Sequence, residues 1–382
     1  MRKKNKDTEV FLELVRAGLW EKEVRLASYG EIDFAEIYRL AKEQAVIGLV
    51  AAGLEHAADK KAQKKDVLQF IGQTLQLEQR NQAMNYFIGV IVYKMRQAGI
   101  YTLLVKGQGI AQCYERPLWR SCGDVDFYLS EDNYEKAKAF LIPLASHVDE
   151  EDQSRHHLGM TIEPWVVELH GTLHSDFSDR MDRGLDEIHQ SIFYSGEVRS
   201  WNNDGLTVFL PSVDNDILIV FTHILQHFYV GGIGLRQICD WCRLMFKFKG
   251  EINLRLLSDR LKRMGLMGEW KAFASLVVDY LGLPEEAMPL YEKTGRNSRR
   301  ASKIMRLVVD AGNFGHNNDE SYRTKYPYPV HKTMTFWRRL GEFAQLFAIC
   351  PMNTLKFFFT YVFRRTKASI KVHGYDDRLK DT

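Results

Sequence analysis

The chain lacks a hydrophobic run long enough to span a membrane. A spanning helix needs about 20 consecutive apolar residues, and no such uninterrupted window occurs in the 382-residue sequence. The sequence therefore does not predict an integral membrane protein.

Cysteine is scarce and neither sign of charge dominates. The 52 Lys and Arg residues almost balance the 49 Asp and Glu residues, and the formal net charge is +3. This balance gives no strong nucleic-acid signal, because such proteins usually carry a basic surface. The cysteines are odd in number and have apolar neighbours, so we expect reduced thiols in a cytoplasmic protein rather than a disulfide framework. They are Cys113, Cys122, Cys239, Cys242 and Cys350.

The most apolar stretch lies at residues 341–363, where Pro351 and polar residues interrupt it. Arginine pairs flank it at 338–339 and 364–365. Two interpretations remain open. Either a pair of C-terminal helices packs on the body, or residues 334–365 make peripheral contact with an anionic membrane surface. The second would place the cytoplasmic protein at the inner membrane surface.

The spacing of apolar residues changes twice along the chain. Residues 8–57 and 67–98 show the three- and four-residue spacing of helices, and this spacing returns after Asp214. Between residues 100 and 174, short apolar runs alternate with polar residues as strands do. This order predicts an α+β fold, with a small mixed β-sheet between extensive N- and C-terminal helical regions.

Four regions follow from this pattern, and two polar stretches read as loops. The loops are expected at 295–303 and 315–329. The regions are an N-terminal helical region at 1–99, an α+β core at 100–200, a helical domain at 201–333 and an amphipathic basic segment at 334–382.

Two aspartates lie one residue apart in a predicted strand, "GDVDFYLS" at 123–130. Strand side chains alternate between faces, so Asp124 and Asp126 project to the same side, about 7 Å apart at the backbone. Two carboxylates this close raise each other's pKa unless a cation neutralises them. Mg²⁺ is suited to the position, because it binds carboxylates together with phosphate oxygens and water.

A third acidic residue lies in "WVVELH", the second of two strands that we expect to join near Glu163–Pro164. Alternation puts Glu168 and His170 on one face. If this strand pairs with residues 124–129, Glu168 reaches the same metal pocket. There it would bind an ion or accept a proton from an incoming hydroxyl.

Upstream, "LLVKGQG" predicts a strand that ends at Lys106–Gly107 and a helix that begins there. Glycine lets the backbone approach a ligand, and the first N–H groups of a helix favour an anion such as phosphate. Lys106 adds a positive charge. Arg120, four residues before Asp124, can bind a phosphate with two nitrogens.

Two further pairs show four-residue spacing on predicted helices. His223 and His227 form one pair, and Arg236 and Asp240 form an i,i+4 pair of opposite charge on the next helix. Two interpretations remain open: a polar seam between packed helices, or a wall of the active-site cleft that contacts the nucleotide or the acceptor.

The stretch "LLVKGQGIAQCYERPLWRSCGDVDFYL", with the later "VVELHGTLH" and "FTHILQHFYVGGIGLRQICDWCRL", resembles the bacterial family of uncharacterised nucleotidyltransferases. That family belongs to the DNA polymerase β-like nucleotidyltransferase superfamily. The similarity covers roughly residues 10–280. It implies a nucleotidyltransferase core within the sheet, with Asp124 and Asp126 as the metal-binding pair and Glu168 as the later acidic position. Lys106, Gly107 and Gly123 match the flanking glycine signature.

The resemblance implies transfer of a nucleoside monophosphate from an NTP to a hydroxyl acceptor, with Mg²⁺ as cofactor (Mn²⁺ is the alternative ion) and release of pyrophosphate. The sequence departs from the superfamily in one place. The usual phosphate loop is Gly-Ser, whereas this chain has Gly107–Gln108.

The leading hypothesis is therefore a Mg²⁺-dependent nucleotidyltransferase whose acceptor is unknown. The alternative is a catalytically inactive nucleotide-binding or partner-binding module of the same fold, antitoxin-like or part of envelope glycan assembly. The expected catalytic and metal-binding residues are Asp124, Asp126 and Glu168. The expected nucleotide contacts are Lys106, Gly107, Arg120, Gly123, His170, His223, His227, Arg236 and Asp240.

Overall fold

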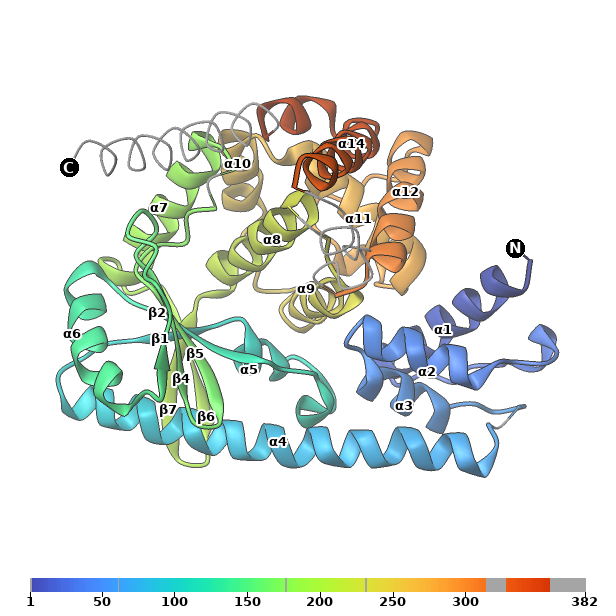
Figure 1. Cartoon of the computed structure of the whole chain (residues 1–382), viewed down its shortest axis with the longest axis horizontal. Helices are drawn as coiled ribbons and strands as arrows, with labels where there is room; N and C mark the ends of the chain where they lie inside the picture. The colour runs from blue at the N-terminus through green and yellow to red at the C-terminus, as the bar shows by residue number, and fades with distance from the viewer. Residues whose placement is uncertain (1, 61, 176, 231, 314–327, 358–382) are drawn as a thin grey trace.

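Helices form both ends of the described chain, and the strands lie between them, as the apolar spacing predicts (Figure 1). The computed structural model describes residues 2–60, 62–175, 177–230, 232–313 and 328–357. The architecture confirms the predicted α+β fold. The helices are α1 Arg2–Trp20, α2 Phe34–Glu43, α3 Ile47–Glu55, α4 Lys64–Gln97, α5 Gly107–Ala111, α6 Glu131–Leu141, α7 Asp179–Phe193, α8 Val213–Val230, α9 Leu235–Lys247, α10 Leu254–Met264, α11 Met267–Leu281, α12 Gly295–Ala311 and α14 Tyr328–Phe347.

Five strands form a mixed sheet in the order β1-β2-β5-β4-β3. The central pair, β2 and β5, is parallel, and the other neighbours are antiparallel. A separate hairpin consists of β6 and β7. It crosses residue 200, the predicted boundary between the α+β core and the helical domain that follows. The strands are β1 Leu103–Val105, β2 Asp124–Tyr128, β3 His147–Val148, β4 His157–Ile162, β5 Trp165–His170, β6 Val198–Asn203 and β7 Leu206–Pro211.

One face of this sheet is apolar and packs against α4 and α6. Val125 and Phe127 of β2 and Val167 and Leu169 of β5 are almost fully buried there. Alternation along each strand separates these residues from the carboxylates between them. Their partners on the two helices are Met84, Ile88, Ile91, Val92, Met95, Tyr134, Ala137 and Leu141.

The long helix α4 connects the sheet to the N-terminal helices. Its 34 residues span about 51 Å at about 1.5 Å per residue, and Figure 1 shows it running from α3 to the sheet. Asn81, near its middle, donates to the carbonyl oxygens of Leu118 (2.7 Å) and Arg120 (2.8 Å). The helix therefore supports the loop that leads into β2.

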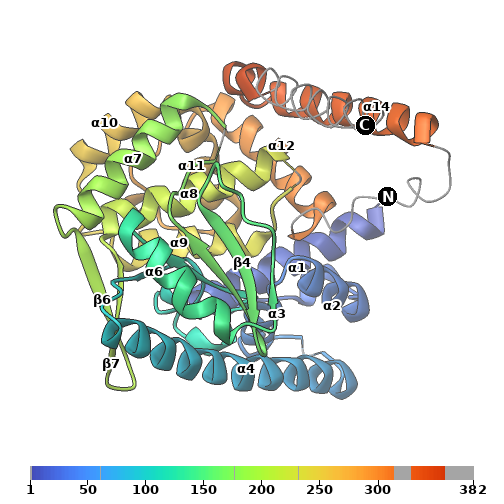
Figure 2. The same ribbon diagram turned by 60° about the vertical axis from the view of Figure 1, so that its left-hand side comes forward.

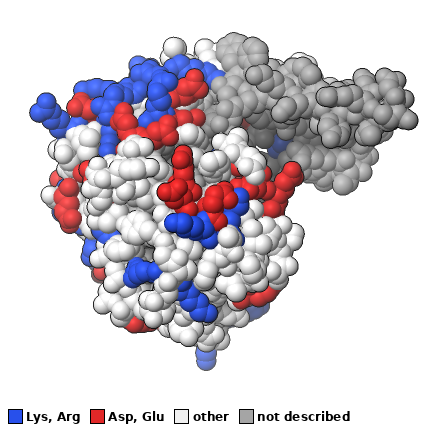
Figure 3. All heavy atoms as spheres, turned by 90° about the vertical axis from the view of Figure 1, so that its left-hand side faces the viewer, with Lys and Arg blue, Asp and Glu red and all other residues white. Residues whose placement is uncertain are grey.

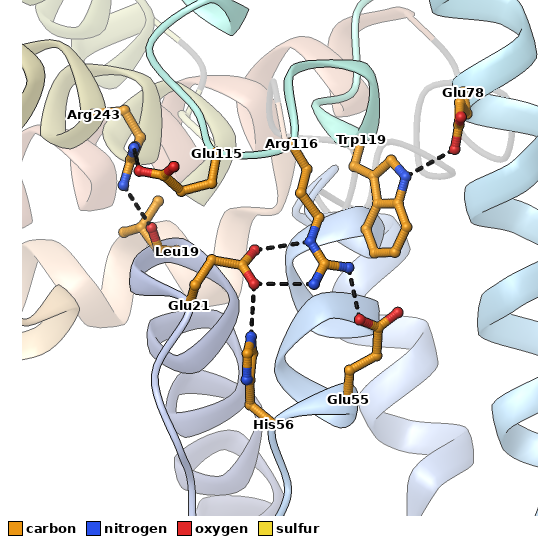
Figure 4. A network of polar contacts seen from close by, with 9 residues as sticks. All are labelled: Leu19, Glu21, Glu55, His56, Glu78, Glu115, Arg116, Trp119 and Arg243. Atoms are coloured by element: carbon orange, nitrogen blue, oxygen red, sulfur yellow. Dashed lines mark hydrogen bonds and ion pairs between the residues drawn. The ribbon is translucent and has the colours of Figure 1, made fainter.

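Polar contacts join the N-terminal helices to the same loop (Figure 4). Arg116 donates to Glu21, after α1, at 3.0 Å and to Glu55, at the end of α3, at 2.7 Å. The Trp119 indole N–H donates to Glu78 of α4 at 3.0 Å. The segment that precedes Asp124 is thus held by α1, α3 and α4 at once.

One predicted loop is wrong. Residues 295–303 belong to α12, which begins after Thr294, whose hydroxyl accepts a hydrogen bond from the N–H of Asn297. Polar residues dominate the first turns, which hides the helical spacing of the buried residues that follow them. Of the second predicted loop, residues 315–327 lie outside the described residues, and residues 328–329 begin α14. The buried residues of α12 are Asn297, Ala301, Ile304, Met305 and Val308.

The helix α14 lies at the edge of the molecule (Figure 2). Among the parts of the chain that the structure describes, no helix is long and apolar enough to cross a membrane. Contact of residues 334–365 with a membrane surface stays a prediction, and residues 358–365 lie outside the described residues. Exposed apolar residues at helical spacing on α14 agree with it: Val330, Met334, Trp337, Leu340 and Phe347.

Acidic and basic side chains both lie on the face of the molecule that carries α6 and α7 (Figure 3). All five cysteines are buried free thiols. Burial raises the pKa of several of these thiols, Cys113 to about 12, so they are poor nucleophiles at neutral pH.

Candidate active site

The three predicted carboxylates meet on the polar face of the sheet. Asp126 of β2 lies directly opposite Glu168 of β5 in the parallel ladder, and Asp124 lies two residues earlier on the same face. The pairing of these strands is as predicted. All three residues line one cavity of about 300 Å³, which is closed on the other side by residues of α8 and α9.

Two nitrogen groups contact Asp126, the Lys106 ammonium and the His170 imidazole. Its Oδ1 accepts a hydrogen bond from Lys106 Nζ at 2.9 Å and lies 2.8 Å from His170 Nε2. The side chain is almost fully buried, which opposes ionisation, but Lys106 and His170 outweigh that effect and lower the pKa of Asp126. Asp126 is therefore a carboxylate at neutral pH.

Asp124 and Glu168 differ in their electrostatics although they share the cavity. Repulsion from Asp126, and then burial, raises the pKa of Asp124. Hydrogen bonds from His157 and His170 instead lower the pKa of Glu168 well below its usual range. Glu168 is consequently a weak base, and Asp124 is the carboxylate whose charge is least compensated.

The turn between β1 and α5 has unusual backbone geometry. Lys106 has φ +56° and ψ −144°, and Gly107 has φ +41°. A non-glycine residue with positive φ is uncommon and costs conformational energy. The turn directs the Lys106 ammonium to Asp126. A Cβ on Gly107 would lie 3.3 Å from Cys122 Sγ, so the two loops pack closely at this point.

Gln108, at the position where the resemblance implies a serine, is directed at α4. It is buried, and its Nε2 donates to Asn81 Oδ1 at 2.8 Å. The side chain therefore supports the loop and is not among the residues that line the cavity.

Arg120 forms a buried ion pair with Asp240. Its Nε and Nη2 donate to the Asp240 carboxylate at 3.0 and 2.6 Å, and Tyr114 donates to the same carboxylate at 2.8 Å. Burial opposes the charge of Arg120, but Asp240 outweighs it and raises the pKa of the guanidinium. The edge of the guanidinium formed by Nε and Nη2 is thus occupied by Asp240. The remaining nitrogen, Nη1, is buried and has no hydrogen-bond partner in the described part of the chain.

Arg236 lines the same cavity. Its Nη1 donates to the carbonyl oxygen of Ser121 at 3.1 Å. Burial and the nearby charge of Arg120 lower the pKa of Arg236. Two guanidinium groups therefore lie close together beside the carboxylates, an arrangement that favours an anionic ligand.

His223 and His227 of α8 face the sheet across the cavity. Their ring centroids lie 4.4 Å apart. Burial and the charge of Lys106 lower the pKa of both rings, that of His227 to about 4. Both imidazoles are therefore neutral at physiological pH, and the interpretation as a cleft wall fits their position better than a seam between helices.

A second cavity of about 220 Å³ adjoins the first. Lys106, Glu168, His223 and His227 line both cavities. Around the second cavity, the other side chains are mostly polar and include Thr172, His174, Ser175 and Gln226. Glu168 and Lys106 thus lie between two adjoining cavities.

Of the predicted site residues, Gly123 alone lines neither cavity. A Cβ on Gly123 would meet no atom within 4 Å, so packing does not require glycine there. His170 lines the second cavity, and the remaining predicted residues line the first.

His157 is a site residue that is absent from the predicted set. It lies on β4 opposite His170, and its Nε2 lies 3.2 Å from Glu168 Oε2. A signal for it exists in the sequence. Counting outward from the turn at Glu163–Pro164 in an antiparallel hairpin places residue 157 opposite residue 170.

The sequence model of a family described as "Uncharacterised nucleotidyltransferase" matches residues 30–282, well over half of the chain. The protein therefore belongs to this family. No curated protein and no solved structure matches the chain.

Proposed function

We propose that this member of the uncharacterised nucleotidyltransferase family transfers a nucleoside monophosphate from an NTP to a hydroxyl acceptor and releases pyrophosphate. One observation carries the proposal. Two parallel strands bring Asp124, Asp126 and Glu168 to one face, where they line a buried cavity together with Lys106, Arg120 and Arg236. Carboxylates for a divalent cation and cations for phosphate thus lie in one chamber.

The carboxylates fit Mg²⁺, with Mn²⁺ as the alternative ion. Their donors are all oxygen, which Mg²⁺ prefers. The raised pKa of Asp124 reflects repulsion that a bound cation would relieve. When bound, the ion would neutralise negative charge on the carboxylates and on the phosphate oxygens. The low pKa of Glu168 favours a ligand role for this residue over that of a base.

Lys106 has two roles in this proposal. Without a nucleotide, its ammonium neutralises Asp126. With a cation at the carboxylates, the ammonium would be able to donate to a phosphate oxygen from its position on the cavity wall. Arg236 and the Arg120 Nη1 supply further donors to the triphosphate.

The reaction itself is an in-line displacement at the α-phosphorus. The acceptor oxygen forms a bond to the α-phosphorus, the bond from this atom to the bridging oxygen breaks so that pyrophosphate leaves, and the hydroxyl proton passes to solvent water. The acceptor enters from the second cavity, which ends at Glu168. The protein contributes positioning and charge neutralisation and forms no covalent intermediate.

A second candidate is the catalytically inactive nucleotide-binding or partner-binding module. Two observations favour it. Lys106 already neutralises Asp126 without an ion, and the residue in the place of the phosphate-binding serine, Gln108, is engaged with α4.

Calorimetric titration with ATP, GTP, CTP and UTP, with and without Mg²⁺, tests the first step. We expect Mg²⁺-dependent binding that Asp124→Asn and Asp126→Asn abolish and that Asp259→Asn, at an exposed position of α10, leaves unchanged. Absence of Mg²⁺-dependent binding in the wild-type protein would refute the proposal.

Labelled-NTP incorporation in a cell lysate tests the second step, because it shows whether protein, nucleic acid, lipid or sugar receives the label. We expect each aspartate variant to lower pyrophosphate release by at least about 10²-fold, the loss typical of removing one charge-stabilising group. Nucleotide binding without any pyrophosphate release in the same lysate would favour the inactive module.

A further inference from the structure

Three side chains on the neighbouring strands β4 and β5 form a nitrogen-containing cluster beside the aspartates. Glu168 Oε2 lies 3.2 Å from His157 Nε2 and 3.5 Å from His170 Nε2. The two imidazole rings are 4.8 Å apart at their centroids. Within the described ranges, this is the one group of three or more His, Cys, Asp or Glu residues whose donor atoms converge closely enough for one ion.

The separations agree with a shared ion. Imidazole nitrogens and carboxylate oxygens bind first-row dications at about 2.0–2.2 Å, so two such donors on one ion lie roughly 3.0–3.4 Å apart. The measured 3.2 and 3.5 Å are close to this range. His170 Nε2 also lies 2.8 Å from Asp126 Oδ1, a contact that it would give up on binding the ion.

The chemistry of the donors separates this cluster from the aspartates. Imidazole suits Zn²⁺, Cu²⁺, Fe²⁺ and Ni²⁺, whereas Mg²⁺ and Mn²⁺ favour carboxylate and water oxygens. Asp124 and Asp126 supply only oxygen, and His157 and His170 supply nitrogen. Glu168 lies between the two sets, opposite Asp126 on one side and within reach of both imidazoles on the other.

The surroundings leave room for the remaining ligands of an ion. His157, Glu168 and His170 all line the second cavity. The residue of β4 opposite Glu168 is Gly159. A Cβ there would lie 2.2 Å from Asp149 Oδ2, so the Asp149 carboxylate lies over Gly159, outside the group of converging donors.

We propose that His157, Glu168 and His170 bind a first-row transition-metal dication, at a position distinct from the magnesium position at Asp124 and Asp126. This site goes beyond the proposed function and does not depend on it, because the ion binds whether or not a nucleotide is transferred.

Titration of the metal-stripped full chain with Co²⁺ alone, followed by its visible d–d absorption, tests the site. We expect saturation at one ion with an intensity typical of nitrogen ligands, and EPR of the Cu²⁺ form that shows coupling to imidazole nitrogen. Mg²⁺ should fail to displace either ion at equal concentration. Wild-type protein without nitrogen coupling, or with Mg²⁺ as an equal competitor, would overturn the proposal.

Variants locate the ion. His157→Gln and His170→Gln should each weaken Co²⁺ binding by at least about 100-fold, because loss of even an outer-shell partner costs 10–100-fold. His147→Gln is the matched control, since His147 is an exposed histidine of the same sheet. Asp124→Asn should retain Co²⁺ binding while it loses Mg²⁺-dependent nucleotide binding, so failure of the proposed function and failure of this site are distinguishable. Unchanged Co²⁺ affinity in both histidine variants would contradict the assignment.

Discussion

The two faces of the same strands have opposite chemistry. On β2, Val125 and Phe127 point to α4 and α6 and are almost fully buried, whereas Asp124 and Asp126 point to α8 and α9 and line a cavity. On β5, Val167 and Leu169 alternate with Glu168 and His170 in the same way.

The difference teaches where stability and chemistry reside in this protein. Burial of the apolar face removes hydrocarbon from water and stabilises the sheet. The opposite face gathers like charges and buried imidazoles, which oppose folding unless cations compensate them. Because one residue of shift exchanges the two faces, the core holds the register on which the site depends.

The strongest test of the stabilising role of the apolar face is to remove a large side chain from it. Phe127→Ala leaves a cavity against α4, and we expect the free energy of unfolding to fall by about 3–5 kcal/mol. Urea denaturation at pH 7 measures the change. Tyr86→Ala is the control, because Tyr86 is an exposed aromatic residue of α4 and its loss should alter the free energy by at most about 0.5 kcal/mol. An unaltered midpoint for Phe127→Ala would show that this face does not support the fold.

A smaller effect should come from acidification of the polar face. Burial and the charge of Lys106 lower the pKa of His227 from 6.5 to about 4. Between these two pH values the unfolded chain binds a proton that the folded protein does not, so stability falls as the pH falls. At about 1.4 kcal/mol per unit, His227 accounts for a loss of about 3 kcal/mol between pH 7 and pH 4.

His227→Asn removes this titration, and we expect its stability to decline less steeply over that range. Denaturant unfolding at several pH values measures the slope, and His147→Asn reports the effect of replacing an exposed histidine. A slope for His227→Asn as steep as that of the wild-type protein would refute the assignment.

The smallest expected change in the free energy of unfolding is that of Asp124→Asn, and it should have the opposite sign to the two losses above. Repulsion from Asp126, followed by burial, raises the pKa of Asp124. Ionised Asp124 therefore lowers stability at neutral pH, and Asp124→Asn should leave the free energy of unfolding equal or higher while nucleotide binding is lost. Thermal unfolding without added metal tests this, with Asp259→Asn as the reference. A marked fall in stability would mean that Asp124 supports the fold rather than the site.

Much of the sheet side of the site could be predicted from the sequence. Period-two alternation places Asp124 with Asp126 and Glu168 with His170, and the hairpin turn at Glu163–Pro164 was expected where β4 meets β5. The Lys106–Gly107 turn also lies where a strand was expected to end and a helix to begin. These features depend on neighbours in the chain, so local patterns report them.

The helical side could not be predicted in the same detail. Arg120 was expected to hold a phosphate with two nitrogens, yet Asp240, 120 residues away in the sequence, occupies that face. The direction of Gln108 toward Asn81 likewise depends on how α4 packs below the loop. The periodicity of a sequence does not indicate which side chains from distant segments come into contact.

The sequence by itself determined which residues of a predicted strand share a face, since side-chain direction follows from the backbone repeat. Only the tertiary structure decided that Lys106 reaches Asp126, that His157 joins Glu168, and that α8 and α9 close the cavity above them. The physical reason is the separation along the chain over which each interaction acts. Backbone geometry acts over a few residues, whereas ion pairs and burial depend on how separate elements pack in space.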